Sequence, residues 1–230
     1  MPPTEMKNSQ HKSVSCAKNI FCVFRVFRGL KVFLGEIKQG NFMTQEEQIE
    51  AIRQRARKNF SKGFNCAECV VEAVVNLVET GLPKGILKLA TGFGGGVGLY
   101  GDTCGAIAGA VLAVGAVHGR SSLPEGEPKE ASKMAAQELY GKPGLYRLFN
   151  QIPNRIKEKF GSTLCRDLTQ PWKENWLCRD HAMHCREIIT ESAKIAAELV
   201  LSDKTELAFR PFGANVENLA DEAEACSIKG

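Results

Sequence analysis

The sequence lacks an apolar run long enough to cross a bilayer. The longest charge-free apolar stretch, Thr103–Val117, has 15 residues and is rich in glycine and alanine, whereas a membrane-spanning helix needs about 20 residues. A secretory leader is not evident either, because three basic residues interrupt the apolar segment Ile20–Leu34. We therefore expect a cytoplasmic protein, in which cysteines are more often metal ligands or redox groups than structural bridges.

The sequence also has little excess charge and few cysteines. Residues 1–42 carry seven basic and two acidic residues, a balance of +5, so the rest has 23 basic and 24 acidic residues, a balance of −1. A nucleic-acid-binding domain has a basic surface of its own, so we expect no nucleic-acid partner. Nine cysteines in 230 residues are too few for a secreted disulfide scaffold, and an odd number cannot pair completely.

The chain divides into three parts by composition. Residues 1–43 form a basic and aromatic arm, which is either disordered or precedes the true start of the protein at Met43; binding to an anionic membrane surface is the less favoured alternative. Residues 44–202 form a cysteine-containing helical domain. Residues 203–230 form a tail with a short acidic helix expected near Val216–Ala225.

Helical periods separated by helix-stop residues fill the middle part. Thr44 with Glu47, and Asn65 with Glu68, have the spacing of N-terminal capping boxes. The expected helices are 44–60, 66–79, 83–90, a Gly/Ala helix capped by Asp102 or Thr103 and ending near 117, 129–140, 145–160, and one from 175 or 180 to 201. No convincing two-residue alternation indicates a strand. We predict an all-α fold, a compact bundle of about six to seven helices.

A glycine-rich loop, Gly92–Gly101, precedes the Gly/Ala helix. A dinucleotide fingerprint needs a strand before such a loop, and a phosphate loop needs Gly-Lys followed by Ser or Thr. Here a helix precedes the loop and that tripeptide is absent, so nucleotide binding is disfavoured. Glycines in this place instead allow the backbone to approach another helix or a cofactor closely.

Two cysteines are predicted at helix starts. Cys66 follows the N-cap Asn65, and Cys104 lies in the first turn of the Gly/Ala helix. Unpaired N–H groups and the positive end of the helix dipole stabilise a thiolate in such a position. The alternative is a close-packed helix with inert buried cysteines, since free cysteine often serves as a small core residue.

Further cysteines make a functional cluster more plausible than inert burial. Cys165 follows a helix end, and Cys178, His181 and Cys185 share one helical face through spacings of three and four. The two helix-start thiols together with these later cysteines suffice for a four-thiolate iron–sulfur or zinc site, or for redox-active disulfides. The Cys66-x-x-Cys69 pair has no following histidine, which excludes covalent haem attachment there.

Together these residues resemble a known family. The segment Cys104-Gly105-Ala106-Ile107-Ala108-Gly109 reads C-G-A-x-x-G, with Asn65-Cys66-Ala67 upstream and Cys165-Arg166-Asp167-Leu168 and Cys185-Arg186-Glu187-Ile188 downstream. This pattern, from about Thr44 to Leu199, resembles the C_GCAxxG_C_C family of redox-active proteins. The resemblance implies redox chemistry at cysteine and a redox partner protein, such as an oxidoreductase.

The resemblance also implies a site, because the family shares four cysteines. By position these are Cys66, Cys104, Cys165 and Cys185. Cys185 suits the fourth position better than Cys178, because an amphipathic helix follows it. The glycines expected around the cofactor are Gly94, Gly95, Gly96 and Gly105. We treat the other cysteines as extras outside the site, and His181 and His184 as ordinary surface or helix residues.

We expect electron transfer through an iron–sulfur cluster held by these four cysteines. The alternatives are a thiol–disulfide protein using the same cysteines, a structural zinc module in a helical interaction protein, and a plain bundle without a cofactor. A nucleophilic cysteine with His118 as base is disfavoured, because His118 lies about 21 Å along the helix from Cys104. The Gly/Ala helix suits a tight helix contact, either within one chain or between the copies of a homo-oligomer.

Overall fold

A computed structural model describes residues 43–213 and 215–216. The predicted arm, the tail beyond residue 216 with most of its expected acidic helix, and Cys16, Cys22 and Cys226 lie outside the described residues. Within them the chain forms α-helices, 3₁₀-helices and loops, with an isolated antiparallel bridge between Thr103 and Leu164. The all-α prediction is confirmed over this part of the chain.

The described residues form nine α-helices and two 3₁₀-helices, which are labelled η. In chain order these are α1 (Gln45–Ser61), α2 (Cys66–Leu77), η1 (Lys84–Phe93), α3 (Gly105–His118), α4 (Pro128–Tyr140), α5 (Leu145–Phe149), α6 (Gln151–Phe160), α7 (Cys165–Leu168), η2 (Gln170–Trp172), α8 (Arg179–Val200) and α9 (Lys204–Ala208). Over the described ranges, no helix combines the length and apolarity needed to span a membrane.

The first two helices begin where the capping boxes predict. Thr44 caps α1 together with Glu47. The Asn65 side chain accepts hydrogen bonds from the first backbone N–H groups of α2. In return, the backbone N–H of Asn65 donates to the Glu68 carboxylate. Asn65 also donates to the carbonyl oxygen of Thr91 at 2.9 Å, which ties the start of α2 to η1. Cys66 is therefore fixed as the first residue of α2.

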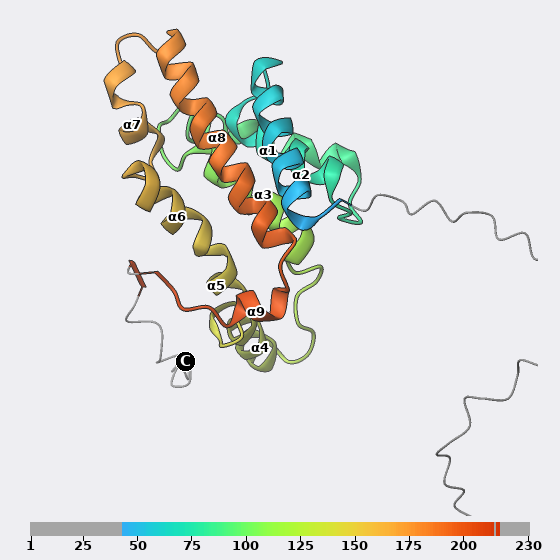
Figure 1. Ribbon diagram of the computed structural model, residues 1–230. Coiled ribbons are helices and arrows are strands. Elements are labelled where there is room, and N and C mark those ends of the chain that lie inside the picture. The colour runs from blue at the N-terminus through green and yellow to red at the C-terminus, as the bar shows by residue number, and fades with distance from the viewer. Residues whose placement is uncertain (1–42, 214, 217–230) are drawn as a thin grey trace, which may run out of the picture. The chain divides into compact units, whose positions relative to one another are not determined.

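The core forms where α1, α2, α3 and α8 pack against one another (Figure 1). The contact between α2 and α3 brings the two backbones together: a Cβ on Gly109 would lie only 2.6 Å from the carbonyl oxygen of Ala67. Ala106, Ala110 and Ala113 of α3 are completely buried. The small residues of α3 thus serve a tight helix contact within the chain.

Several element boundaries differ from the prediction. The segment after Pro83 is a 3₁₀-helix rather than an α-helix. The helix expected over 145–160 divides at Asn150 into α5 and α6, and Pro153 lacks the N–H that would bond to the preceding turn. The residue that caps α3 is Cys104, not Asp102 or Thr103, because the bridge with Leu164 holds Thr103 outside the helix. Helix α9 was not predicted.

A polar network joins α1 to α2. The Arg55 guanidinium forms a two-pronged contact with the Glu72 carboxylate, which also accepts from the side chain of buried Asn59. Burial would raise the pKa of Glu72, but the hydrogen bonds from Arg55 and Asn59 outweigh it and lower the pKa below the ordinary 4.5. A carboxyl group with a lowered pKa in the folded state stabilises the fold above its unfolded pKa.

We predict that Glu72→Gln lowers the free energy of unfolding by about 1–3 kcal/mol at pH 7, the cost of disrupting hydrogen bonds to a charged group. The difference from wild type should shrink as the pH falls below 4.5, because the wild-type carboxylate is then protonated on unfolding. Urea denaturation of both proteins at a series of pH values measures this difference in the free energy of unfolding. Glu187→Gln, at an exposed position of α8, is the control. A difference between Glu72→Gln and wild type that did not change with pH would contradict the prediction.

Candidate functional site

Two loops far apart in the sequence pair side by side and place two of the predicted cysteines. The backbone N–H of Cys104 donates to the carbonyl oxygen of Thr163 at 2.8 Å, and that of Cys165 donates to Asp102 at 2.7 Å. These bonds flank the bridge between Thr103 and Leu164. Cys104 thus stands at the start of α3 next to Cys165 at the start of α7.

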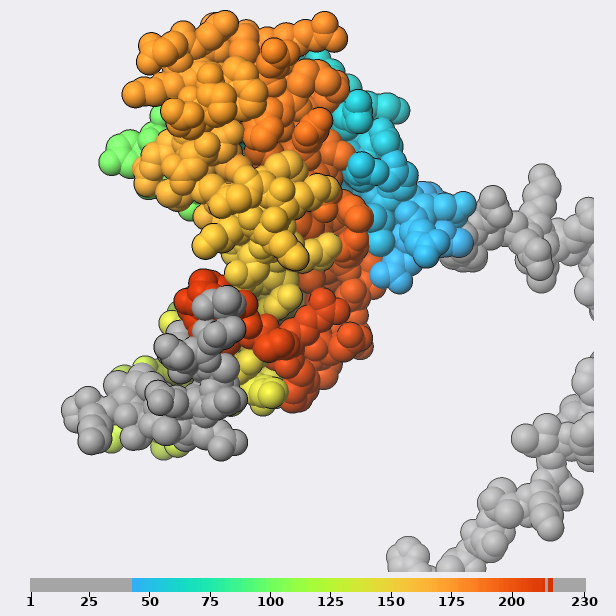
Figure 2. All heavy atoms as spheres, turned by 60° about the vertical axis from the view of Figure 1, so that its left-hand side comes forward, coloured from blue at the N-terminus to red at the C-terminus, as the bar shows by residue number. Residues whose placement is uncertain are grey.

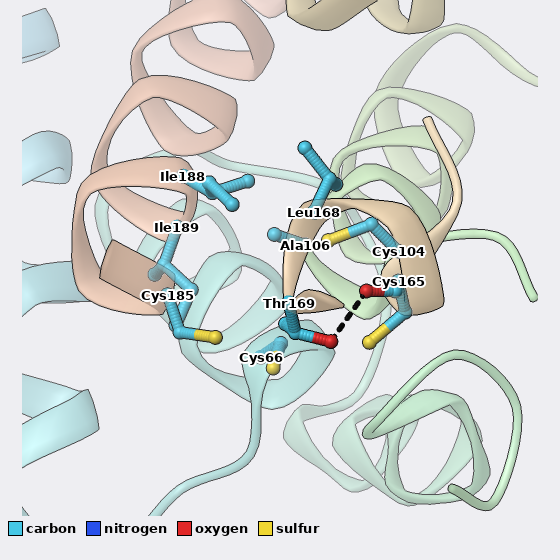
Figure 3. Close-up of a pocket in the computed structure, with 9 residues that line it drawn as sticks. All are labelled: Cys66, Cys104, Ala106, Cys165, Leu168, Thr169, Cys185, Ile188 and Ile189. Carbon is cyan, nitrogen blue, oxygen red and sulfur yellow. Dashed lines mark hydrogen bonds between the residues drawn. The ribbon is translucent and has the colours of Figure 1, made fainter. Parts of the chain in front are cut away.

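The other two predicted cysteines arrive from neighbouring helices. Cys66 begins α2, and a Cβ on Gly105 of α3 would lie 3.2 Å from its Cβ. Cys185 lies in the second turn of α8. All four line one cavity, shown in Figure 3. We call Cys66, Cys104, Cys165 and Cys185 the pocket cysteines.

The cavity is small and mostly apolar. Its volume is about 10 Å³, close to the space that one water molecule needs. Besides the pocket cysteines it is lined by Ala106, Leu168, Thr169, Ile188 and Ile189. Cys104 and Cys165 are buried, whereas Cys66 and Cys185 are half-buried. A group held here would therefore be surrounded by thiols and hydrocarbon.

The remaining described cysteines lie outside the cavity. The Cys69 thiol is buried in the core and donates to the carbonyl oxygen of Phe64 at 3.5 Å. Cys178 caps α8, and its sulfur accepts from the N–H of His181 at 3.4 Å. The structure therefore brings together the four cysteines that the family resemblance selected and leaves these two apart.

The glycine-rich loop contains a left-handed turn. The five successive residues 95–99 have φ between 62° and 71°, among them the non-glycine residues Val97 and Leu99. Such a conformation costs about 1–2 kcal/mol for each residue with a side chain. Successive N–H groups in turns of this kind can form concavities that bind anions, including those at iron–sulfur sites. Figure 2 shows the green loop beside the orange segment that contains α7.

The four predicted glycines all occupy close contacts. Gly94 abuts the side chain of Asn65, and Gly95 abuts Leu99 in its own loop. A Cβ on Gly96 would come within 2.7 Å of the Cβ of Cys165. Together with Gly105 against Cys66, these contacts explain why small residues surround the pocket cysteines. Contact with a cofactor stays a prediction for all four glycines.

Burial dominates the protonation of the pocket cysteines. It raises the pKa of Cys104 to about 12 and that of Cys165 to about 11, and it also raises the pKa of Cys66 and Cys185. Negative charge on Cys66 would raise the pKa of the other three further. The expectation of thiolates at Cys66 and Cys104 was therefore wrong, because desolvation raises the pKa by more than the N–H groups near the helix starts lower it.

Nearby N–H and O–H groups offset part of the effect of burial on the pKa of three of the four thiols. The backbone N–H of Gly95 acts on Cys66, those of Ala106 and Ile107 act on Cys104, and Thr169 acts on Cys165, and each lowers the pKa of its thiol. These donors are too weak to ionise the thiols alone. They would stabilise the sulfurs once a positive group drew off the protons.

His181 is buried beside the pocket rather than on the surface. Its Nδ1 donates to the carbonyl oxygen of Trp176, so its Nε2 accepts from the Cys185 thiol at 3.3 Å. His184 packs between Trp172 and Phe160. The spacing of four between His181 and Cys185 was the sequence signal for this contact. His118 bonds the carbonyl oxygen of Leu199 at the far end of α3, away from the pocket.

The donor set of the pocket, four cysteine thiols, is one that both an iron–sulfur cluster and a zinc ion can use. A zinc ion needs four donors at about 2.0–2.3 Å from one point. Across the described part of the chain, no group of three or more His, Cys, Asp or Glu side chains is arranged to hold a metal ion. The four thiolates of an iron–sulfur cluster would bind more than one iron, so they need not meet at a single point. The cavity, with a volume of about 10 Å³, must widen to admit a cluster.

One comparison with known proteins gave a match. A family model described as "Putative redox-active protein (C_GCAxxG_C_C)" matches residues 64–199, more than half of the chain. This range includes all four pocket cysteines and the glycine-rich loop. Searches of curated proteins and of solved structures found no match.

The raised pKa values predict slow alkylation of the pocket cysteines. In native protein treated with a chelator, the rates at Cys104 and Cys165 should rise about tenfold per pH unit up to pH 10, because only the thiolate reacts. Glutathione, whose thiol ionises nearer the ordinary pKa of about 8.5, should level off sooner. Mass spectrometry after timed iodoacetamide treatment measures each site. An alkylation rate at either cysteine that stopped rising below pH 9 would contradict the prediction.

The left-handed turn predicts a contrast between two alanine substitutions. Gly96→Ala places a Cβ 2.6 Å from the carbonyl oxygen of Asp102 and against Cys165, whereas Gly98→Ala meets no atom within 4 Å. Both have positive φ, so each pays a backbone cost of about 1–2 kcal/mol. Thermal unfolding should show Gly96→Ala to be the less stable by a further 1–3 kcal/mol or so. Equal stabilities of the two variants would contradict the prediction, because they would show that the loop of Gly96 can move away from Asp102 and Cys165 without cost.

Proposed function

This chain belongs to the C_GCAxxG_C_C family of redox-active proteins, and we propose that its pocket cysteines hold an iron–sulfur cluster. The protein would take one electron from a donor protein and pass it to an acceptor protein, with an oxidoreductase as one of the two. A reducing compartment such as the cytoplasm suits the free thiols of the site. When bound, a cluster supplies reversible one-electron chemistry.

One observation carries this proposal: four cysteine thiols from separate segments line one small apolar cavity, and backbone N–H groups that favour the charged sulfur lie near two of them. A neutral thiol gains little from a backbone N–H at its sulfur, whereas a metal-bound thiolate gains a charge-assisted bond. The Gly95 amide at Cys66 and the Ala106 amide at Cys104 provide such bonds. The left-handed turn places the non-glycine residues Val97 and Leu99 at positive φ, which costs strain that a gain at the site would offset.

Different residues around the pocket would have different roles. The pocket cysteines would bind the irons, and the backbone donors would stabilise the negative charge of the thiolates. Leu168, Ile188 and Ile189 exclude water, which strengthens each of these interactions. The alternatives use the same thiols: a zinc ion would take all four as ligands, and a disulfide mechanism would need a thiolate, which burial disfavours at Cys104 and Cys165.

Anaerobic purification followed by treatment with ferrous iron and sulfide tests the proposal. We expect broad absorbance near about 400 nm, with iron and sulfide in similar amounts. Serine at any one pocket cysteine should remove or strongly reduce this absorbance. Cys69→Ala and Cys178→Ser, at the two described cysteines outside the cavity, should retain it. Dithionite should bleach the absorbance and air should restore it.

The contrary results identify the alternatives. Zinc without iron in the purified protein would indicate a structural module. A colourless protein that stays free of metal after reconstitution would contradict the proposal, and a count of free thiols before and after mild oxidation would then test the thiol–disulfide alternative. Loss of the absorbance in Cys178→Ser but not in Cys185→Ser would overturn the assignment of the fourth ligand.

A further inference from the structure

Among the described residues that line the cavity, Thr169 alone carries a hydroxyl group. It follows α7, is only 2% exposed, and donates through Oγ1 to the carbonyl oxygen of Cys165 at 2.7 Å (Figure 3). A hydroxyl bonded to the carbonyl four residues earlier is common in helices. Thr190 of α8 makes the same kind of bond, to Arg186 at 2.6 Å, and does not line the cavity.

The Thr169 hydroxyl has a second acceptor within reach. Cys165 and Thr169 both line the small cavity, and Figure 3 shows the Thr169 oxygen beside both the carbonyl oxygen and the sulfur of Cys165. The carbonyl oxygen is therefore the present acceptor of the hydroxyl, and the sulfur is a neighbouring one. Since it has one proton to donate, it serves one of these acceptors at a time.

The carbonyl oxygen of Cys165 does not depend on the hydroxyl. The backbone N–H of Thr169 also donates to it, at 3.0 Å. If the hydroxyl turns to the sulfur, the buried carbonyl keeps a partner and no orphaned acceptor results. Rotation about one side-chain bond thus transfers a donor from a satisfied oxygen to the sulfur at little cost.

We propose that Thr169 is a positioning residue that raises the reduction potential of the pocket centre by donating to the Cys165 sulfur when this sulfur is a thiolate. The inference rests on the proposed function. Reduction by one electron adds negative charge that the sulfurs share, so a donor at sulfur stabilises the reduced form more than the oxidised form. The hydroxyl leaves the carbonyl for the sulfur in response to that charge.

Redox titration of reconstituted protein with dithionite, in the presence of mediators, tests this role. Thr169→Val keeps the shape of the side chain and removes the hydroxyl, and it should lower the midpoint potential. We expect a change of about tenfold in the reduction equilibrium, equivalent to about 59 mV for one electron. Thr169→Ser, which keeps the hydroxyl, should restore the wild-type potential.

Thr190→Val is the matched control, because it removes a buried hydroxyl with the same type of bond outside the cavity. It should lower the thermal unfolding temperature and leave the potential unchanged. If Thr169→Val does not take up a cluster, the potentials of Thr169→Ala and Thr169→Ser are compared instead. An unchanged potential in a loaded variant without the hydroxyl would overturn the role of Thr169 alone. Failure of the wild-type protein to take up a cluster would overturn both proposals.

Discussion

The backbone pairing between residues 101–104 and 163–166 is the interaction on which the site depends. It places Cys104 at the start of α3 and Cys165 at the start of α7 through hydrogen bonds of 2.7–2.9 Å. The pairing leaves no space for a Cβ at position 96, so the loop that reaches Cys66 must have a glycine there. One short contact between distant segments thereby determines both the position of two thiols and the composition of the loop beside them.

Desolvation and hydrogen bonding oppose each other at these thiols. Burial keeps Cys104 and Cys165 protonated at neutral pH, whereas the nearby donors favour the charged sulfur. The balance would shift if a cation replaced the protons, because the apolar lining would then strengthen every charge-assisted bond. A pocket of this kind is a poor source of free thiolates and a suitable environment for bound ones. That asymmetry distinguishes the cluster proposal from a thiol–disulfide mechanism.

Local signals in the sequence predicted the helices well where they act within a few residues. The capping boxes at Thr44 and Asn65 locate the starts of α1 and α2. The same reasoning was wrong at Cys104, because a bridge to a residue distant in sequence removes Thr103 from the helix. It was also wrong about the ionisation of the thiols, because their desolvation depends on apolar residues from other helices, such as Ile188 and Ile189.

The sequence by itself determined the all-α class, the main helix starts and, through its resemblance to a family, the choice of the four cysteines that line one cavity. These features depend on side-chain type and on spacing along the chain. Only the tertiary structure decided that the four thiols share one cavity while Cys69 and Cys178 do not, that they are neutral, and that Thr169 and the Gly95 amide face them. Convergence and burial arise when distant segments pack together, and spacing within a single helix does not encode them.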